Sequence, residues 1–484
     1  MISPSLPPEI TDNIIDVVHE SNDIQTLKAC SLVSSIFRIR SQRNLYDTIT
    51  IKYPFSSWNA HPAQPFVDVL LIHPELAEHI RNLLILDFME GEWQMPVYGN
   101  EIVADSVLPQ IFKMLGSLTS FTLMGPLYHG DDSTRPLASL GMQLTTPFTL
   151  ELLNMFVRTE VIEINIGGVR GIPLSRIAST CPHLRRLSIT QLPDSTIGEL
   201  SVNPERFNST TYPPLPEEPQ LADMDFRASG QLERLSLDAC SVGAIHHFRE
   251  RIINEPRCLI TLAHLRELNI TGCDLAMTLL AAPIIADAAR TLDSFLWEVP
   301  KQCRDFALLP ILFEALGNTT NLHTLRLVFT DEYHFSSYAL LQLPQMFEHL
   351  SASNKLEELV IAYSPKHLIP FGTESEQNWA SSLDTLLSKG QDFPFLRHVC
   401  VLVSVEYRHM YQFDASTLSY SDQLHDAFSQ LSLQKKLRLS MIVDRDIDIH
   451  ERIEYLRPGS DYWPSLGVIN PGWYGDYKET IYIS

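Results

Sequence analysis

One spacing of apolar residues returns along most of the chain: an apolar residue, two variable residues, a second apolar residue, one variable residue and a third apolar residue. Copies of this pattern start between residues 80 and 396 and lie about 35 residues apart on average, as in stacked-repeat proteins. The ten copies are Ile80-Leu83-Ile85, Leu118-Phe121-Leu123, Val161-Ile164-Ile166, Leu184-Leu187-Ile189, Leu232-Leu235-Leu237, Leu265-Leu268-Ile270, Leu292-Phe295-Trp297, Leu322-Leu325-Leu327, Leu356-Leu359-Ile361 and Leu396-Val399-Val401.

The last two apolar positions of each copy are separated by a single residue, which is the period of a β-strand. Helical stretches precede most copies, so strand and helix alternate. Parallel strands need such crossover helices, and we therefore expect an α/β fold with one parallel sheet and the helices outside it. The clearest helical stretches are 104–115, 244–254, 275–289, 306–316, 337–350 and 379–387.

The first fifty residues follow a different, helical spacing. Pro7 and Pro8 suit the start of a helix, where a missing N–H costs nothing, and Asn22 or Asp23 can cap a second helix. So short a unit has little interior of its own. Part of its apolar surface is therefore expected to face a partner.

Three blocks in this unit resemble the F-box motif, in the variant common in fungal proteins. The blocks are Leu6-Pro7-Pro8-Glu9-Ile10, Leu27-x-x-Cys30-Ser31-x-Val33-Ser34-x-x-Phe37 and Leu45-Tyr46-x-x-Ile49. The family often has Trp where Phe37 stands and a basic residue where Ile36 stands; Phe preserves the packing role. The alternative is an N-terminal helical cap on the repeats.

The resemblance implies three helices that dock on the adaptor subunit of a cullin-RING ubiquitin ligase. Carried over by position, the adaptor-binding residues are Leu6, Pro7, Ile10, Ile14, Leu27, Cys30, Val33 and Ser34.

The repeats in turn resemble leucine-rich repeats. The best copies are those that end at Cys240 and Cys273; the others lack the closing Asn or Cys. The resemblance implies a solenoid with its parallel sheet on the concave face. An F-box followed by such repeats is an arrangement of substrate receptors, in which the repeats hold a target protein. The alternative is a leucine-rich-repeat scaffold outside any ligase.

These patterns divide the chain into an F-box (1–51), a linker or first cap (52–79), an irregular leucine-rich-repeat solenoid (80–449) and an aromatic tail (450–484). Residues 190–231 interrupt the repeats with an acidic, proline-rich loop, which either binds something or has no binding role. The tail either caps the last repeat or forms an aromatic binding platform.

Charge narrows the possible partners. With 36 Lys and Arg against 58 Asp and Glu, the net charge of −22 disfavours binding to nucleic acids and anionic membranes. The N-terminus has no signal-peptide pattern, and the most apolar stretch, 275–286, is too short to span a membrane. The seven cysteines contain no CxxC pair, which favours a reducing compartment, the cytoplasm or the nucleus.

The sequence holds no motif of a known catalytic site, so we expect no enzyme activity and no cofactor. Asp444, Asp446, Asp448 and His450 would share one face of a strand. We interpret them as the solvated face of an edge strand rather than as a metal site, because Ile449 stands where a calcium loop has Gly. An enzyme that uses these carboxylates is the remaining alternative.

The variable strand positions should point away from the helices, because side chains alternate along a strand. These positions are polar in the copies that start at 161, 184, 232 and 265 and half apolar in the last four copies. An apolar patch there must be covered, either by a substrate or by the tail, through Trp463, Trp473 or Tyr474. The expected substrate-binding residues are Leu296, Arg326, Val328, Val360, His398 and Leu402.

Overall fold

The computed structural model describes most of the repeat region and the N-terminal helices. Within it the chain separates into two compact units: residues 1–236 with 243–262, and residues 237–242 with 263–484. We describe each unit by itself. The described residues are 7–52, 61–86, 107–125, 142–190, 230–299, 309–329, 335–350, 355–363, 374–406, 422–444 and 480–482, with gaps at 22, 145, 171–173, 239, 241–244, 247, 251, 253–259, 273–274 and 391.

The first unit begins with three helices, α1 (Pro8–Glu20), α2 (Ile24–Val33) and α3 (Ser35–Tyr46). Their starts follow from local chemistry. Pro8 opens α1, where its missing N–H costs nothing. The Asp23 carboxylate accepts the Thr26 amide N–H at 3.0 Å and caps α2. The Ser34 hydroxyl accepts the Ile36 amide N–H at 3.3 Å and caps α3.

Strand β1 (Thr48–Lys52) joins the helices directly to the sheet. It runs parallel to β2 (Asn82–Leu86), with Ile49 opposite Leu83 and Ile51 opposite Ile85. The unit boundary expected after residue 51 therefore falls inside a strand of the sheet.

Strands and helices then alternate through the rest of the first unit. The helices are α4 (Gln64–Ile72), the 3₁₀ helix η1 (Pro74–His79), α5 (Leu108–Met114), α6 (Thr146–Arg158) and α7 (Leu174–Thr180). The strands are β3 (Ser120–Met124), β5 (Glu163–Gly167), β7 (Arg186–Thr190) and β9 (Arg234–Asp238), which reaches into the second unit, and the short pairs β4 (Met142–Gln143) with β6 (Val169–Arg170) and β8 (Gly230–Gln231) with β10 (Ile260–Thr261).

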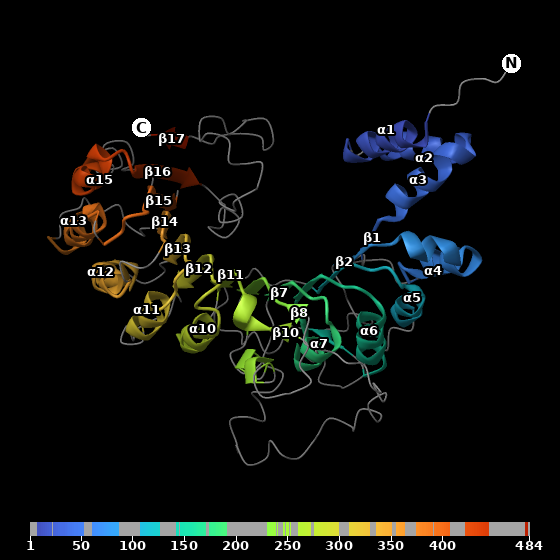
Figure 1. The fold of residues 1–484 in the computed structure, drawn as a ribbon, viewed down its shortest axis with the longest axis horizontal. Coiled ribbons are helices and arrows are strands. Elements are labelled where there is room, and N and C mark those ends of the chain that lie inside the picture. The colour runs from blue at the N-terminus through green and yellow to red at the C-terminus, as the bar shows by residue number, and fades with distance from the viewer. Residues whose placement is uncertain are drawn as a thin grey trace, which may run out of the picture. The chain divides into compact units, whose positions relative to one another are not determined.

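In the second unit the helices lie along one side of the strands (Figure 1). Its helices are η4 (Leu262–His264), α10 (Leu275–Asp287), α11 (Leu309–Gly317), α12 (Phe335–Glu348), α13 (Glu374–Ser388) and α15 (Ser429–Leu433). Its strands are β11 (Glu267–Thr271), β12 (Ser294–Val299), β13 (Thr324–Phe329), β14 (Glu358–Tyr363), β15 (His398–Glu406), β16 (Leu437–Asp444) and β17 (Thr480–Tyr482).

The long strands form one open sheet in chain order, from β1 to β17, without β4, β6, β8 and β10. Its first twelve strands are parallel, and β17 pairs antiparallel with β16. The expected mixed α/β class and parallel sheet are confirmed, and every copy of the apolar pattern supplies one strand. Strands β1 and β16 add to the sheet beyond these copies.

The core lies between the sheet and the helices. The last two apolar positions of each copy point into it, as expected. Four of the copies illustrate this, because none of these side chains is more than 1% exposed: Leu235, Leu237, Leu268, Ile270, Leu325, Leu327, Leu359 and Ile361. Aromatic rings pack edge to face behind them: Phe347 of α12 contacts Phe313 of α11 and Phe393, which lies in the connection before β15.

A ladder of backbone hydrogen bonds fixes the register between repeats. The carbonyl oxygen just before one strand accepts two amide N–H groups from the start of the next strand, at 2.7 to 3.1 Å. Because this bond pattern needs no particular side chain, it tolerates the irregular sequence of the repeats. The accepting carbonyls belong to Asp47, Arg81, Thr119, Ile162, Arg185, Arg266, Asp293, His323 and Glu357.

Candidate interaction surfaces

Helix α1 carries an apolar stripe that faces solvent. Ile10, Ile14 and Val17 follow each other at helical spacing and are 46%, 46% and 63% exposed. The helix is attached through its other side, where Thr11 and Ile15 are buried. An exposed apolar stripe lowers the solubility of an isolated protein and is typical of a surface that binds a partner.

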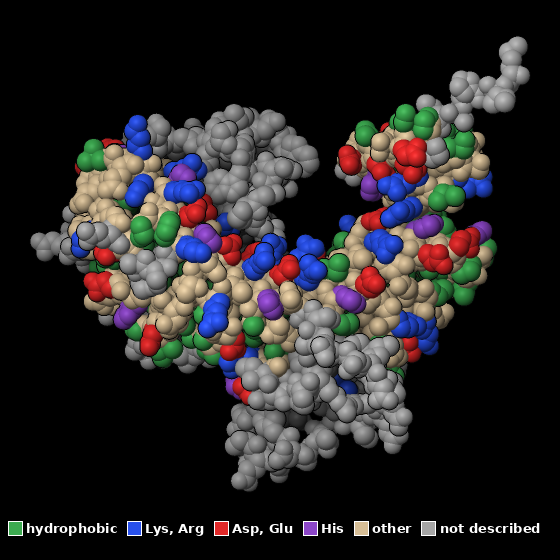
Figure 2. All heavy atoms as spheres, in the orientation of Figure 1, with side chains coloured by type: hydrophobic (Ala, Val, Ile, Leu, Met, Phe, Trp, Pro, Cys, Tyr) green, Lys and Arg blue, Asp and Glu red, His purple; other side chains and the backbone are tan. Residues whose placement is uncertain are grey.

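A second group of exposed apolar side chains lies around the junction of α2 and α3. Leu32 and Val33 at the end of α2 are 80% and 76% exposed, and Ile36 and Ile39 on α3 are 57% and 70% exposed. Figure 2 shows hydrophobic side chains on the visible surface of the three helices. The sequence motif pointed to Val33 but not to the other three.

The expected adaptor-binding residues divide into exposed and buried ones. Pro7, Ile10, Ile14 and Val33 are exposed, Cys30 and Ser34 are half-buried, and Leu6 lies outside the described residues. Leu27 is fully buried, so the expectation that it contacts a partner is wrong for this structure. Among the residues of α2 it is the buried one, so it belongs to the interior of the protein.

A polar clasp fixes α1 on α3. The Arg40 guanidinium donates to both carboxylate oxygens of Asp16, from Nε at 2.7 Å and from Nη2 at 2.5 Å. Asn44 Nδ2 donates to the same carboxylate at 3.0 Å. The hydrogen bond from Arg40 lowers the pKa of Asp16, and the bond to Asp16 raises the pKa of Arg40. Both side chains are about one-third exposed.

The sheet face away from the helices is polar and partly open in the first unit. Its central positions in β3, β5, β7 and β9 are Thr122, Asn165, Ser188 and Ser236, and all four are half-buried. Asn165 Nδ2 donates to Thr122 Oγ1 at 3.3 Å, which ties neighbouring strands. The polarity expected from the sequence for these copies agrees with this partial exposure.

The corresponding face of the second unit is closed. On strands β12 to β15 the outward-facing side chains Leu296, Val328, Val360 and Leu402 are only 2% to 4% exposed. Leu296, Val328 and Leu402 form one buried cluster with Ala362. The apolar patch that the sequence indicates is therefore covered in this structure, and binding of a substrate to it stays a prediction. The aromatic residues Trp463, Trp473 and Tyr474, expected as one possible cover, lie outside the described residues.

Two charged side chains are buried on this closed face. Arg326 is 5% exposed, with its Nη2 3.9 Å from Glu358 Oε2. Glu298 is 2% exposed and accepts the Gly272 amide N–H at 2.6 Å. Gly272 has a φ of 57°, a backbone conformation that glycine adopts far more easily than other residues. The hydrogen bond from its amide to Glu298 stabilises this turn after β11.

Of the six expected substrate-binding residues, only His398 is exposed. Cys400, the neighbour of Leu402 on this face, is buried, and burial raises the pKa of its thiol to about 11. A thiol with so high a pKa is inert at neutral pH.

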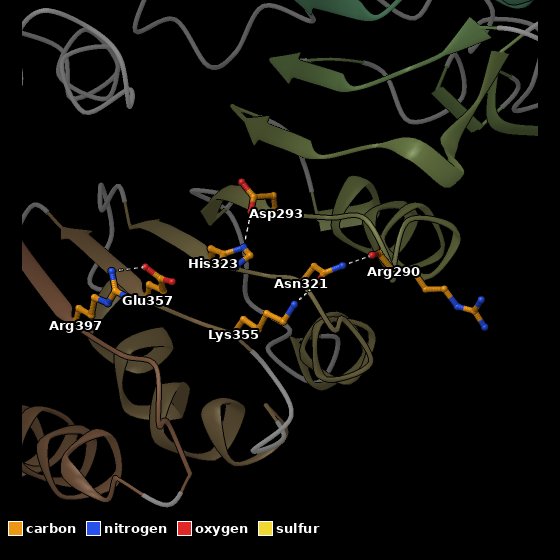
Figure 3. A network of polar contacts seen from close by, with 7 residues as sticks. All are labelled: Arg290, Asp293, Asn321, His323, Lys355, Glu357 and Arg397. Carbon is orange, nitrogen blue, oxygen red and sulfur yellow. Dashed lines mark hydrogen bonds and ion pairs between the residues drawn. The ribbon is translucent and has the colours of Figure 1, made fainter.

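The starts of strands β12 to β15 carry a polar network on the surface of the second unit. In it His323 Nδ1 lies 2.5 Å from Asp293 Oδ1, and Arg397 Nη1 lies 3.2 Å from Glu357 Oε2. Each contact joins one repeat to the next and leaves every one of these side chains more than one-third exposed, so it adds little stability. Figure 3 shows all seven residues, Arg290, Asp293, Asn321, His323, Lys355, Glu357 and Arg397.

Within the described ranges, no three His, Cys, Asp or Glu side chains come together as a metal would require. Asp444 is the last residue of β16, and Asp446, Asp448 and His450 lie outside these ranges. Among the helices that the structure describes, none has the length and apolar character to cross a bilayer.

Neither a scan against models of protein families nor a search of curated proteins finds a match to this chain. The resemblance to the F-box and leucine-rich-repeat families therefore rests on the motif residues themselves.

Proposed function

We propose that the chain is the substrate-recognition subunit of a cullin-RING ubiquitin ligase of the F-box type. The three N-terminal helices dock on the adaptor subunit, and the strand–helix repeats act as a leucine-rich-repeat solenoid that holds a target protein. Transfer of ubiquitin belongs to other subunits, so the chain needs no active site or cofactor. Such a receptor works in the cytoplasm or the nucleus.

The observation that carries the proposal is the exposed apolar surface of the helices. Ile10 and Val33 come from the motif blocks that resemble an F-box, Ile14 is carried over by position between these blocks, and all three face solvent. The repeats cannot use these side chains for their own packing while they remain exposed. A helical cap, the alternative role, would bury its apolar residues against the repeats.

The test is binding to the ligase adaptor subunit, measured by calorimetry with the full chain. Ile10→Glu and Val33→Glu should each weaken binding about tenfold or more, because a charge replaces an apolar contact at the interface. Both side chains are exposed, so the unfolding midpoint should change little. Leu71→Glu on α4 is the matched control, since Leu71 is 65% exposed and lies outside the motif.

The alternative of a repeat scaffold outside any ligase predicts a different result. The wild-type chain would then show no affinity for the adaptor. Unchanged binding in both variants, or a large loss of stability with binding intact, would also exclude the proposed docking surface.

A further inference from the structure

The three N-terminal helices carry two exposed apolar surfaces. The first, the α1 stripe, consists of Ile10, Ile14 and Val17. The second, the junction group, consists of Leu32, Val33, Ile36 and Ile39. A partner of either surface has to match both its apolar side chains and the charges beside them.

The charges beside the α1 stripe are negative. Helix α1 has no Lys or Arg, and its four carboxylates are Glu9, Asp12, Asp16 and Glu20. Glu9 directly precedes Ile10 and is exposed, and Glu20 is exposed three residues after Val17. Asp16 is paired with Arg40. The surface that fits the α1 stripe is therefore apolar with basic groups beside it.

The junction group has basic neighbours. Residues 24–46 contain no Asp or Glu and four basic side chains, Lys28, Arg38, Arg40 and Arg43. Lys28 lies one turn before Leu32, and Arg43 lies one turn after Ile39, so each extends its apolar line along the helix. Both are exposed, and neither is paired with a carboxylate of the described residues. The matching surface is apolar with acidic groups beside it.

The two carboxylates that flank this segment do not reverse its charge. Asp23 caps α2 by accepting the Thr26 amide N–H at 3.0 Å, and Asp47 accepts Asn82 Nδ2 at 2.9 Å. Counted with both, residues 23–47 have four basic and two acidic side chains, a net charge of +2, whereas α1 has a net charge of −4. The charge separation therefore lies within one small helical unit.

We propose that the α1 stripe of one chain docks on the junction group of a second copy of the same chain. Each surface supplies the apolar area and the charges that the other lacks, with Glu9 as the acidic anchor and Lys28 and Arg43 as the basic ones. A different partner would have to be basic against α1 and acidic against the junction group. An anionic membrane fits the junction group but is repelled by α1.

The contact joins two unlike surfaces. It is therefore made twice in a two-fold dimer, or once between successive chains in a longer assembly. The net charge of −22 on each chain opposes association. At physiological ionic strength, salt screens exposed charges more than about 8 Å apart, so the nearby opposite charges count most. The association is weak and reversible, as contacts of small area are.

Self-association would also regulate docking on the ligase adaptor, a consequence that rests on the proposed function. Ile10, Ile14 and Val33 are the side chains proposed for adaptor docking, and they belong to the two surfaces that meet between copies. One surface cannot hold two partners at once, so the adaptor and a second copy compete. The adaptor should therefore dissociate the self-associated chain.

The test is sedimentation velocity of the full chain at physiological ionic strength, over a wide range of protein concentration. Glu9→Lys with Asn13→Lys makes α1 basic at two exposed positions, and Lys28→Glu with Arg43→Glu makes the junction group acidic. Each pair should raise the dissociation constant about tenfold or more, because like charges then face each other. The unfolding midpoint should change little, since all four positions are exposed.

The decisive variant carries all four substitutions. Its charges are exchanged between the two surfaces, so it should associate with itself again but not with the wild-type chain. Arg290→Glu with Lys389→Glu makes the same charge change as the junction variant at exposed positions of the second unit and should leave association unchanged.

The proposal is overturned if the wild-type chain is monomeric at every concentration, or if the paired variants associate as it does. It is also overturned if the fourfold variant is folded but monomeric. A monomeric wild-type chain that floats with anionic phospholipid vesicles would assign the junction group to a membrane surface instead. Adaptor binding is measured separately, so its absence would remove the competition and leave the self-contact in place.

Discussion

Helix α1 is held less by apolar burial than its sequence suggests. Among its described side chains only Thr11 and Ile15 are buried, while the residues at apolar spacing face solvent. The hydrogen bonds from Arg40 and Asn44 to Asp16 therefore help to fix the rotation of α1 about its own axis relative to α3. It decides which side of the helix carries the exposed stripe.

Asp16→Asn should loosen α1 without unfolding the unit. The amide keeps the shape of the carboxylate but cannot accept two charged hydrogen bonds from Arg40, so we expect a loss of about 1 kcal/mol in the free energy of unfolding. Hydrogen exchange should accelerate in α1 more than in α2. Glu20→Gln removes one negative charge at the exposed end of the same helix and serves as the control.

The clasp also has a defined dependence on pH. The pKa of Asp16 is lower in the folded protein than in the unfolded chain, so its contribution is complete above the unfolded pKa of about 3.9 and is lost as the pH falls through the folded value. The stability difference between wild type and Asp16→Asn should therefore stay constant above about pH 5 and shrink in stronger acid. A difference that grows on acidification would contradict the ion pair. Urea unfolding at several pH values measures it.

At the scale of helices and strands, the apolar pattern predicted most of the sheet because one strand needs only two inward positions separated by one residue. Ile49 and Ile51 have that spacing too and form β1. Because no earlier copy of the pattern precedes them, the sequence analysis assigned them to the end of the N-terminal helical segment. Leu437 and Leu439 in β16 lack the first apolar position, since Gln434 stands there. Both missed strands lie beyond the copies of the pattern.

The candidate surfaces were less predictable for a physical reason. A sequence pattern shows that Leu296 and Val328 point away from the helices, but not whether distant residues cover them. Leu27 shows the same limit in α2, where an apolar motif residue turned out to be buried. Alternation along a strand or helix is local, whereas exposure depends on the packing of the whole chain.

Truncating a single strand residue that points into the core should strongly lower the free energy of unfolding. Leu325 is fully buried between the sheet and the helices, so Leu325→Ala should lower the free energy of unfolding by about 2–5 kcal/mol through lost burial and a residual cavity. Leu71→Ala, at an exposed apolar position of α4, should cost less than about 0.5 kcal/mol. Urea unfolding followed by circular dichroism compares the two. Equal losses would mean that Leu325 is not part of a packed layer.

For the molecule as a whole, β1 links the helical unit and the repeats. Its residues pair with β2 along the whole strand, and the Asp47 carbonyl accepts the amide N–H groups of Arg81 and Asn82 at 2.9 Å. Ile51 is buried and covers the first layer of the repeat core. A stacked array needs such a cover at its end, because the last layer otherwise meets water.

Two truncations separated by only six residues should therefore behave differently. A chain that starts at residue 47 loses the three helices and keeps β1, so its repeats should remain folded. A chain that starts at residue 53 also loses β1, which exposes the edge of β2 and the side chains beneath Ile51. Its free energy of unfolding should be lower by about 3 kcal/mol, from lost apolar burial and backbone hydrogen bonds.

The second truncated chain should also self-associate through the bare edge of β2, which light scattering detects. If both chains prove equally unstable, the contact of α3 with η1 caps the sheet instead of β1. The helices would then be needed for folding, and their removal could not be used to separate adaptor docking from target binding. If the shorter deletion alone is tolerated, residue 47 is the correct place to divide the chain for separate tests of the two proposed binding functions.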